Sequence, residues 1–221
     1  MKKLPVIAMF LFVASAAFAQ NEKFVKAMEA LVTTVDTTRS VETLKTLSNS
    51  FERIGDAEKT QWLPYYYAAL AQLNAGNGIM STQDPMKGGL AATLDPLADK
   101  AEELLNKAEA MKKDNSEIFV VKKMIASMRM MGDPMNRFMQ YGPQATQALE
   151  TAKKLDPSNP RITYLEAIDK FYTPEQYGGS KTEAKKLFEE ALKKYEAFKP
   201  ESSIHPSWGK GNTQYFLTQV K

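Results

Sequence analysis

Five methionines recur along one segment at the spacing of a helix face. They are separated by steps of four, three, four and four residues: Met124, Met128, Met131, Met135 and Met139. Thioethers are soft ligands, so a methionine-rich exported sequence is able to bind copper(I). The same spacing describes a buried helix face, because methionine fills irregular gaps in apolar cores. Gly132-Asp133-Pro134 should break the helix, so the five sulfur atoms need not share a face. We favour the core role and keep a copper(I) site as the alternative.

The densest aromatic cluster is Trp62, Tyr65, Tyr66 and Tyr67. On a helix these four side chains cannot all point the same way. Exposed Tyr and Trp residues often anchor binding partners, whereas aromatic positions inside helical repeats often pack against the next helix. Both interpretations stay open for this cluster. With two residues from later loops, the candidate partner-binding residues are Trp62, Tyr65, Tyr66, Met86 and Tyr141.

Catalytic constellations are hard to find in this sequence. The chain has no cysteine and one histidine, His205, which argues against the usual zinc and thiol chemistries. His205 is expected to pack locally where a C-terminal helix docks. The stretch "YGGSK" (177–181) superficially resembles a phosphate loop, but it lacks the first glycine and a preceding strand. We therefore predict a protein that is not an enzyme, with no catalytic residues, no metal site and no cofactor.

The first nineteen residues have the three-part pattern of a secretory signal peptide. Lys2 and Lys3 are followed by an apolar run (6–13) and then by Ala17-Phe18-Ala19. The run is too short to span a bilayer, which takes roughly 20 apolar residues. We predict a signal peptide over residues 1–19, with cleavage after Ala19. The mature chain is then periplasmic or secreted, without a transmembrane segment.

Charge narrows the class of partner. The 29 basic residues less Lys2 and Lys3 leave 27, against 26 acidic ones. This near balance argues against nucleic acid or anionic lipid as the main partner, since both require a concentrated positive field. Another exported or envelope protein is the partner that we expect.

The elements that must position these residues are predicted to be helices. Apolar residues follow helical spacing in most segments, for example at Ala101, Leu104, Leu105, Ala108 and Met111. Proline suits the first turn of a helix when a short polar residue precedes it. Such pairs occur at Asp84-Pro85, Asp95-Pro96, Asp133-Pro134, Asn159-Pro160 and Thr173-Pro174. Two capping boxes are predicted, at Asp114…Glu117 and Ser180…Glu183.

One pattern of small and large residues recurs three times. It comprises Ala101, Leu105 and Ala108, then Ala145, Leu149 and Ala152, then Ala184, Phe188 and Ala191. With the tight turn "LDPSNP", this pattern resembles the second helix of the tetratricopeptide repeat (TPR) family over roughly residues 60–198. The resemblance implies an all-α fold, an antiparallel helix-hairpin array or α-solenoid, as a single domain over residues 20–221.

The repeats are longer than the usual 34 residues of that family. The excess lies between the two helices of each pair, in "GNGIMSTQDPMKGGLAATLDP", "GDPMNRFMQYGP" and "YTPEQYGGS". We expect these to be extended loops on one face of the array, where such insertions often bind ligands. The chain also resembles a group of exported bacterial TPR-like proteins through "FERIGDAEKTQWLPYYYAAL", "DPSNPR" and "HPSWG". That resemblance implies export and a helical-repeat fold.

These observations predict an exported, non-catalytic protein-binding or scaffold module. The alternative is a carrier of a small ligand or of copper(I), which would use the methionine-rich segment or a closed groove.

Overall fold

A computed structural model describes residues 22–220, and every regular element in that range is helical. Residues 22–37 form a helix. The helices that follow are α2 (Val41–Glu58), α3 (Leu63–Met80), α4 (Ala91–Met111), α5 (Ser116–Gly132), α6 (Pro134–Leu155), α7 (Pro160–Tyr172), α8 (Lys181–Ala197) and α9 (Lys210–Gln219). Two short 3-10 helices, η1 (Pro85–Lys87) and η2 (Glu175–Tyr177), lie between them. The all-α prediction is confirmed, and the predicted signal peptide lies outside the described residues.

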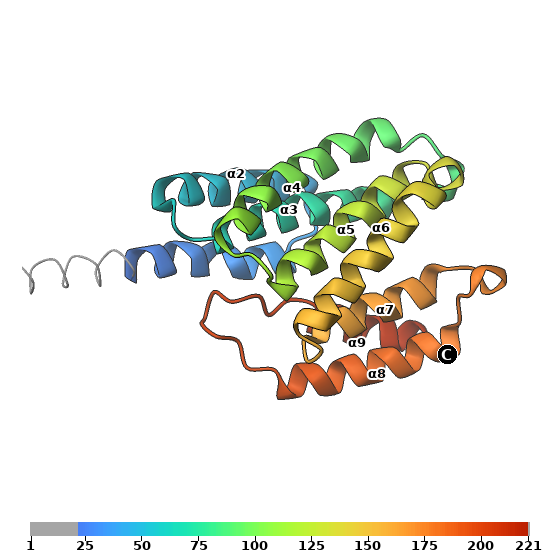
Figure 1. Cartoon of the computed structure of the whole chain (residues 1–221). Coiled ribbons are helices and arrows are strands. Elements are labelled where there is room, and N and C mark those ends of the chain that lie inside the picture. Colours follow the sequence, from blue (N-terminus) through green and yellow to red (C-terminus); the bar gives the residue numbers. More distant parts are fainter. Residues whose placement is uncertain (1–21, 221) are drawn as a thin grey trace, which may run out of the picture.

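Helices that are consecutive in the chain pack side by side as an antiparallel array (Figure 1). Three hairpins, α3–α4, α5–α6 and α7–α8, place their reversals at the same end of the array (Figure 1). α6 and α7 contact each other only lightly, so the first half of α6 is left uncovered on its outer side. No helix within residues 22–220 is long and apolar enough to cross a membrane.

The small residues of the recurring pattern lie where the helices meet. All nine residues of the three patterns, alanines and larger residues together, are buried: Ala101, Leu105, Ala108, Ala145, Leu149, Ala152, Ala184, Phe188 and Ala191. Their methyl groups let neighbouring helices approach closely, and the larger side chains fill the space between pairs. The predicted helix-hairpin array is therefore confirmed.

The second helices of two hairpins begin earlier than predicted. "GDPMNRFMQYGP" is not an extended loop, because α6 starts at Pro134 and includes Pro143. Asp95-Pro96 does not begin a helix either, since α4 starts at Ala91 and Pro96 lies inside it. Extended connections occur only at residues 81–90 and 173–180 among the three hairpins.

Several helix starts follow the predicted cap chemistry. Asn159 and Ser180 accept hydrogen bonds from the amides of Arg161 and Glu183, which confirms both caps. At α5 the capping residue is Asn115, not Asp114, and it accepts from the amide of Glu117. Thr173-Pro174 precedes η2 and does not start an α-helix.

Candidate functional site

An exposed apolar surface lies at the reversal end of the array. We call it the α6 face, and it consists of Met135, Phe138 and Met139 with Met86 from η1. Their exposed fractions are 79, 57, 82 and 59% respectively. Residues 135, 138 and 139 share one side of the helix, because they follow the i, i+3, i+4 rule. η1 contacts both α5 and α6, which brings Met86 to this end of the molecule.

Arg137 fixes the first turn of α6 to α4. Its guanidinium donates to both carboxylate oxygens of Asp95, at 2.6 and 2.8 Å, and to the carbonyl of Arg129 at 3.1 Å. The hydrogen bonds from Arg137 lower the pKa of Asp95, so this carboxylate is ionised at neutral pH. A two-point contact of this kind sets orientation as well as distance. The α6 face is thus presented by a helix whose start is held in place.

The loop that carries Met86 is also shaped by specific residues. Asp84 accepts a hydrogen bond from the amide of Met86 at 3.0 Å and so caps η1. Gly88 and Gly89 follow with φ of 72° and 85°, a left-handed conformation that favours glycine. Lys87 is exposed, and it forms no ion pair with another residue in the described range. A free cation therefore lies next to Met86.

The five methionines divide into two groups. Met128 is buried, and Met124 and Met131 pack against the same core. Met135 and Met139 lie on α6, beyond the break at Asp133, and are exposed. The core prediction is therefore confirmed for the three residues of α5 and is wrong for the two on α6. Within residues 22–220 no three His, Asp or Glu side chains gather into a metal site.

The candidate aromatic residues lie in a different place from Met86. Tyr65 and Tyr66 are buried, and Trp62 is partly buried against the same core. Of the two interpretations of this cluster, packing holds for Tyr65 and Tyr66, and these two candidate partner-binding residues do not form an exposed surface. α3 is packed against α2, α4 and α5, so almost every residue of its first four turns is covered. Tyr141 is half-buried on α6.

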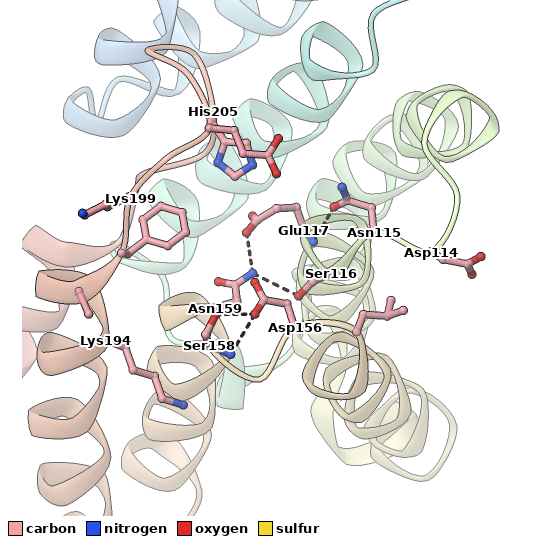
Figure 2. A pocket seen from close by; sticks show the side chains of 14 residues that line it. Asp114, Asn115, Ser116, Glu117, Asp156, Ser158, Asn159, Lys194, Lys199 and His205 are labelled. Carbon is pink, nitrogen blue, oxygen red and sulfur yellow. Dashed lines mark hydrogen bonds between the residues drawn. The ribbon is translucent and has the colours of Figure 1, made fainter.

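Tyr66 belongs to a buried polar network that sequence analysis did not predict. Its hydroxyl donates to Glu117 at 2.8 Å and accepts from Trp208 Nε1 at 2.8 Å. Glu117 also accepts from Asn159 (Figure 2) and from Arg161. Burial by itself would lower the pKa of Arg161, but the Glu117 carboxylate raises it above the ordinary value. The stretches "YYY" and "DPSNPR" thus meet at the Glu117 carboxylate, and "HPSWG" joins the network through the bond from Trp208 to Tyr66.

A polar hollow of about 540 Å³ lies beside this network (Figure 2). Its walls include the starts of α5 and α7, the end of α8 and the segment up to His205. His205 lies 6.0 Å from the Phe198 ring, which agrees with the predicted local packing. Glu117 already accepts from four donor groups of three residues, so it serves as the counter-ion of Arg161.

Comparison with known proteins gives one informative result. No protein-family model matches the chain, and no curated protein matches it. The assignment to the TPR family therefore stays a prediction. Among solved structures, the chain is similar to the HusA haemophore from Porphyromonas gingivalis, with a TM-score of 0.76 and 30% sequence identity. The similarity covers 90% of this chain and 92% of that one.

Proposed function

Because the chain belongs to the protein family of the HusA haemophore, we propose that it is an exported, non-catalytic module that carries haem or a related porphyrin on the α6 face. The relative's description as a haemophore supports the ligand class. The single observation on this chain that carries the proposal is the exposure of Met135, Phe138 and Met139 on one side of a helix. This replaces the protein-binding groove expected from sequence as the preferred function.

The α6 face suits a flat apolar ring. Large side chains that are exposed together on one helix mark a binding surface more often than a solvated one. From Met135 to Gly142 the helix rises about 10 Å at 1.5 Å per residue, which is comparable to the width of a porphyrin macrocycle. Phe138 supplies a ring for stacking, and methionine side chains adapt to the shape of what they cover.

Charge and ligand chemistry add to this surface. Haem carries two carboxylates, and Lys87 beside Met86 is an available cation that can pair with one of them. Thioethers and phenolates are among the protein groups that ligate haem iron. Met135 and Met139 are one helical turn apart and both exposed. The same pair would serve the second candidate function, a copper(I) carrier.

Titration of the purified mature chain tests the proposal. Haem, metal-free protoporphyrin and copper(I) are added separately, and the Soret absorbance or a competing copper(I) chelator reports binding. We expect saturable one-to-one binding of haem or protoporphyrin. If both porphyrins bind with similar affinity, the ring and its carboxylates provide the contacts. Binding of copper(I) alone would favour the second candidate, and no binding of any probe would contradict both.

Export is part of the same proposal. It is supported by the signal-peptide pattern before Gln20 and by the relationship to a haemophore. Mass spectrometry of the envelope and culture fractions should find a chain that begins at or near Gln20. An intact chain that starts at Met1 in the cytoplasm would contradict export.

A further inference from the structure

The exposed sulfur atoms of the described chain are concentrated on the α6 face. Met86, Met135 and Met139 of this face are each more than half exposed, whereas Met111, on α4, is 38% exposed. The other methionines within residues 22–220 are buried or partly buried. An oxidant that approaches from solvent therefore meets the thioethers of the α6 face before those of the core.

No thiol competes for such an oxidant. Cysteine and methionine are the side chains whose sulfur is oxidised stepwise in proteins, and this chain contains no cysteine. The thioethers are thus its only sulfur groups. The predicted export would place them outside the cytoplasm, where thiol systems keep proteins reduced.

The reaction of a thioether with hydrogen peroxide is a two-electron oxygen transfer. A sulfur lone pair attacks one peroxide oxygen, so that a sulfur–oxygen bond forms as the oxygen–oxygen bond breaks. The second oxygen keeps its proton, takes up the proton of the first and leaves as water. The sulfur is oxidised to a sulfoxide and the peroxide is reduced. Methionine sulfoxide reductases reverse the change, and they oxidise two thiols to a disulfide and release water.

On the α6 face, the added oxygen should change the surface and leave the fold intact. The side chains of Met135 and Met139 project into solvent, and Arg137 holds this turn of α6 to α4. Met128 is different, because it is buried so closely against Gly76 that even a Cβ there would overlap its thioether. A sulfoxide is polar, so burying it beneath a porphyrin ring would cost it hydrogen bonds to water.

We propose that Met86, Met135 and Met139 are reversible oxidation sites through which hydrogen peroxide controls the binding of porphyrin to the α6 face. Their thioethers hold the ring, and their sulfoxides release it. A methionine sulfoxide reductase restores the apolar surface. This control rests on the proposed porphyrin function, whereas the order in which the methionines are oxidised does not depend on it.

Peptide mapping by mass spectrometry tests the sites in the purified mature chain without porphyrin. Hydrogen peroxide should add one oxygen to Met135 and Met139 about tenfold faster than to Met28 and Met128, because the latter two are buried. The same treatment in urea is the control, since all methionines of the unfolded chain should react at similar rates. Similar rates for exposed and buried methionines in the folded chain would overturn the proposal.

Titration with metal-free protoporphyrin tests the control of binding. The peroxide dose is one at which Met128 stays unoxidised, and circular dichroism verifies that the helices persist. Treatment should raise the Kd of the unmodified chain about tenfold, and reductase treatment should restore the starting value. The matched variant carries Met86→Leu, Met135→Leu and Met139→Leu, whose side chains are apolar but cannot form sulfoxides. Peroxide should leave this variant at its own starting Kd.

The possible failures of the two proposals are distinguishable. An unchanged Kd of the oxidised unmodified chain, or an equal rise in the leucine variant, would overturn the control by oxidation. A chain that is oxidised in the expected order but binds no porphyrin before treatment would contradict the proposed function and support the oxidation sites alone.

Discussion

Glu117 and Arg161 show how one buried ion pair joins three successive hairpins. Both side chains are almost fully buried, and each lies in the first turn of its helix. The carboxylate accepts from Tyr66 of α3 and from Arg161 and Asn159 at the start of α7. A charge in such a place is tolerated only when it is paired and fully hydrogen-bonded. The pair therefore specifies how α3, α5 and α7 are aligned.

Glu117→Gln should destabilise the fold strongly. The substitution keeps the size of the side chain but leaves the Arg161 guanidinium buried without its counter-ion, which costs about 3–5 kcal/mol. Urea unfolding followed by circular dichroism measures the change. Glu22→Gln is the control, because the Glu22–Lys26 pair is exposed and should contribute less than about 1 kcal/mol. Equal stability of the two variants would show that the network does not align the hairpins.

The residue-level predictions from sequence had mixed success for a physical reason. Local chemistry predicted the caps at Asn159 and Ser180 because a cap involves only its own helix turn. Glu117 was expected only as part of a capping box, and its role as a counter-ion depends on residues 44 to 51 positions away. Tyr66 is part of the same network, and its burial follows from helices that pack around α3 from several sides. Local sequence carries no signal for either arrangement.

At the scale of the helix, the spacing of small residues was the most informative signal. Alanine at the contact between two helices leaves no room for a longer side chain. The pattern around Ala108, Ala152 and Ala191 therefore predicted the helix pairs correctly. Asp133-Pro134 was predicted to begin a helix, and this is confirmed, because Pro134 occupies the first helical position of α6, where no amide is needed. The residues that follow were predicted as an extended loop because proline and glycine usually interrupt helices, but the helix continues through Pro143 on its exposed side.

Two alanines of α4 provide a matched test of the helix contacts. Ala108 is fully buried, and Ala110 in the same helix is exposed. Ala108→Gln should overpack the contact and cost about 1–3 kcal/mol, with a further penalty for the buried amide. Ala110→Gln should change stability by less than about 0.5 kcal/mol. Thermal unfolding measures the melting temperature of both variants, which should be lower for Ala108→Gln. A similar melting temperature for the two would count against the helix contact assigned to Ala108.

At the scale of the whole molecule, the two ends of the array differ in what they expose. The hairpin reversals lie at one end (Figure 1), and the α6 face is exposed there, with Lys87 next to its Met86. The opposite end is covered by the segment between α8 and α9, which Tyr67 and Tyr66 of α3 hold through hydrogen bonds to the Ile204 carbonyl and from the Trp208 indole. Sequence analysis expected three inserted loops on one face of the array and included Met86 among the candidates; two of these segments, residues 81–90 and 173–180, are loops at the reversal end. It missed Phe138, because the segment around it was expected to be a loop without a shared face.

The most direct test of the porphyrin-carrier account compares two sets of methionines. Met135→Gln with Met139→Gln removes apolar contact from the α6 face, and Met111→Gln makes the same change at an exposed position near the other end of the array. Burial of a methionine side chain contributes about 1.5–3 kcal/mol, and loss of half of this at each of the two positions, about 1.5–3 kcal/mol together, corresponds to at least a tenfold weaker Kd. Absorbance titrations with haem and protoporphyrin measure the Kd of each variant relative to that of the unmodified chain. The account predicts a Kd at least tenfold higher for the double variant and an unchanged Kd for Met111→Gln. Equal affinities in all three chains would show that the porphyrin does not bind on the α6 face.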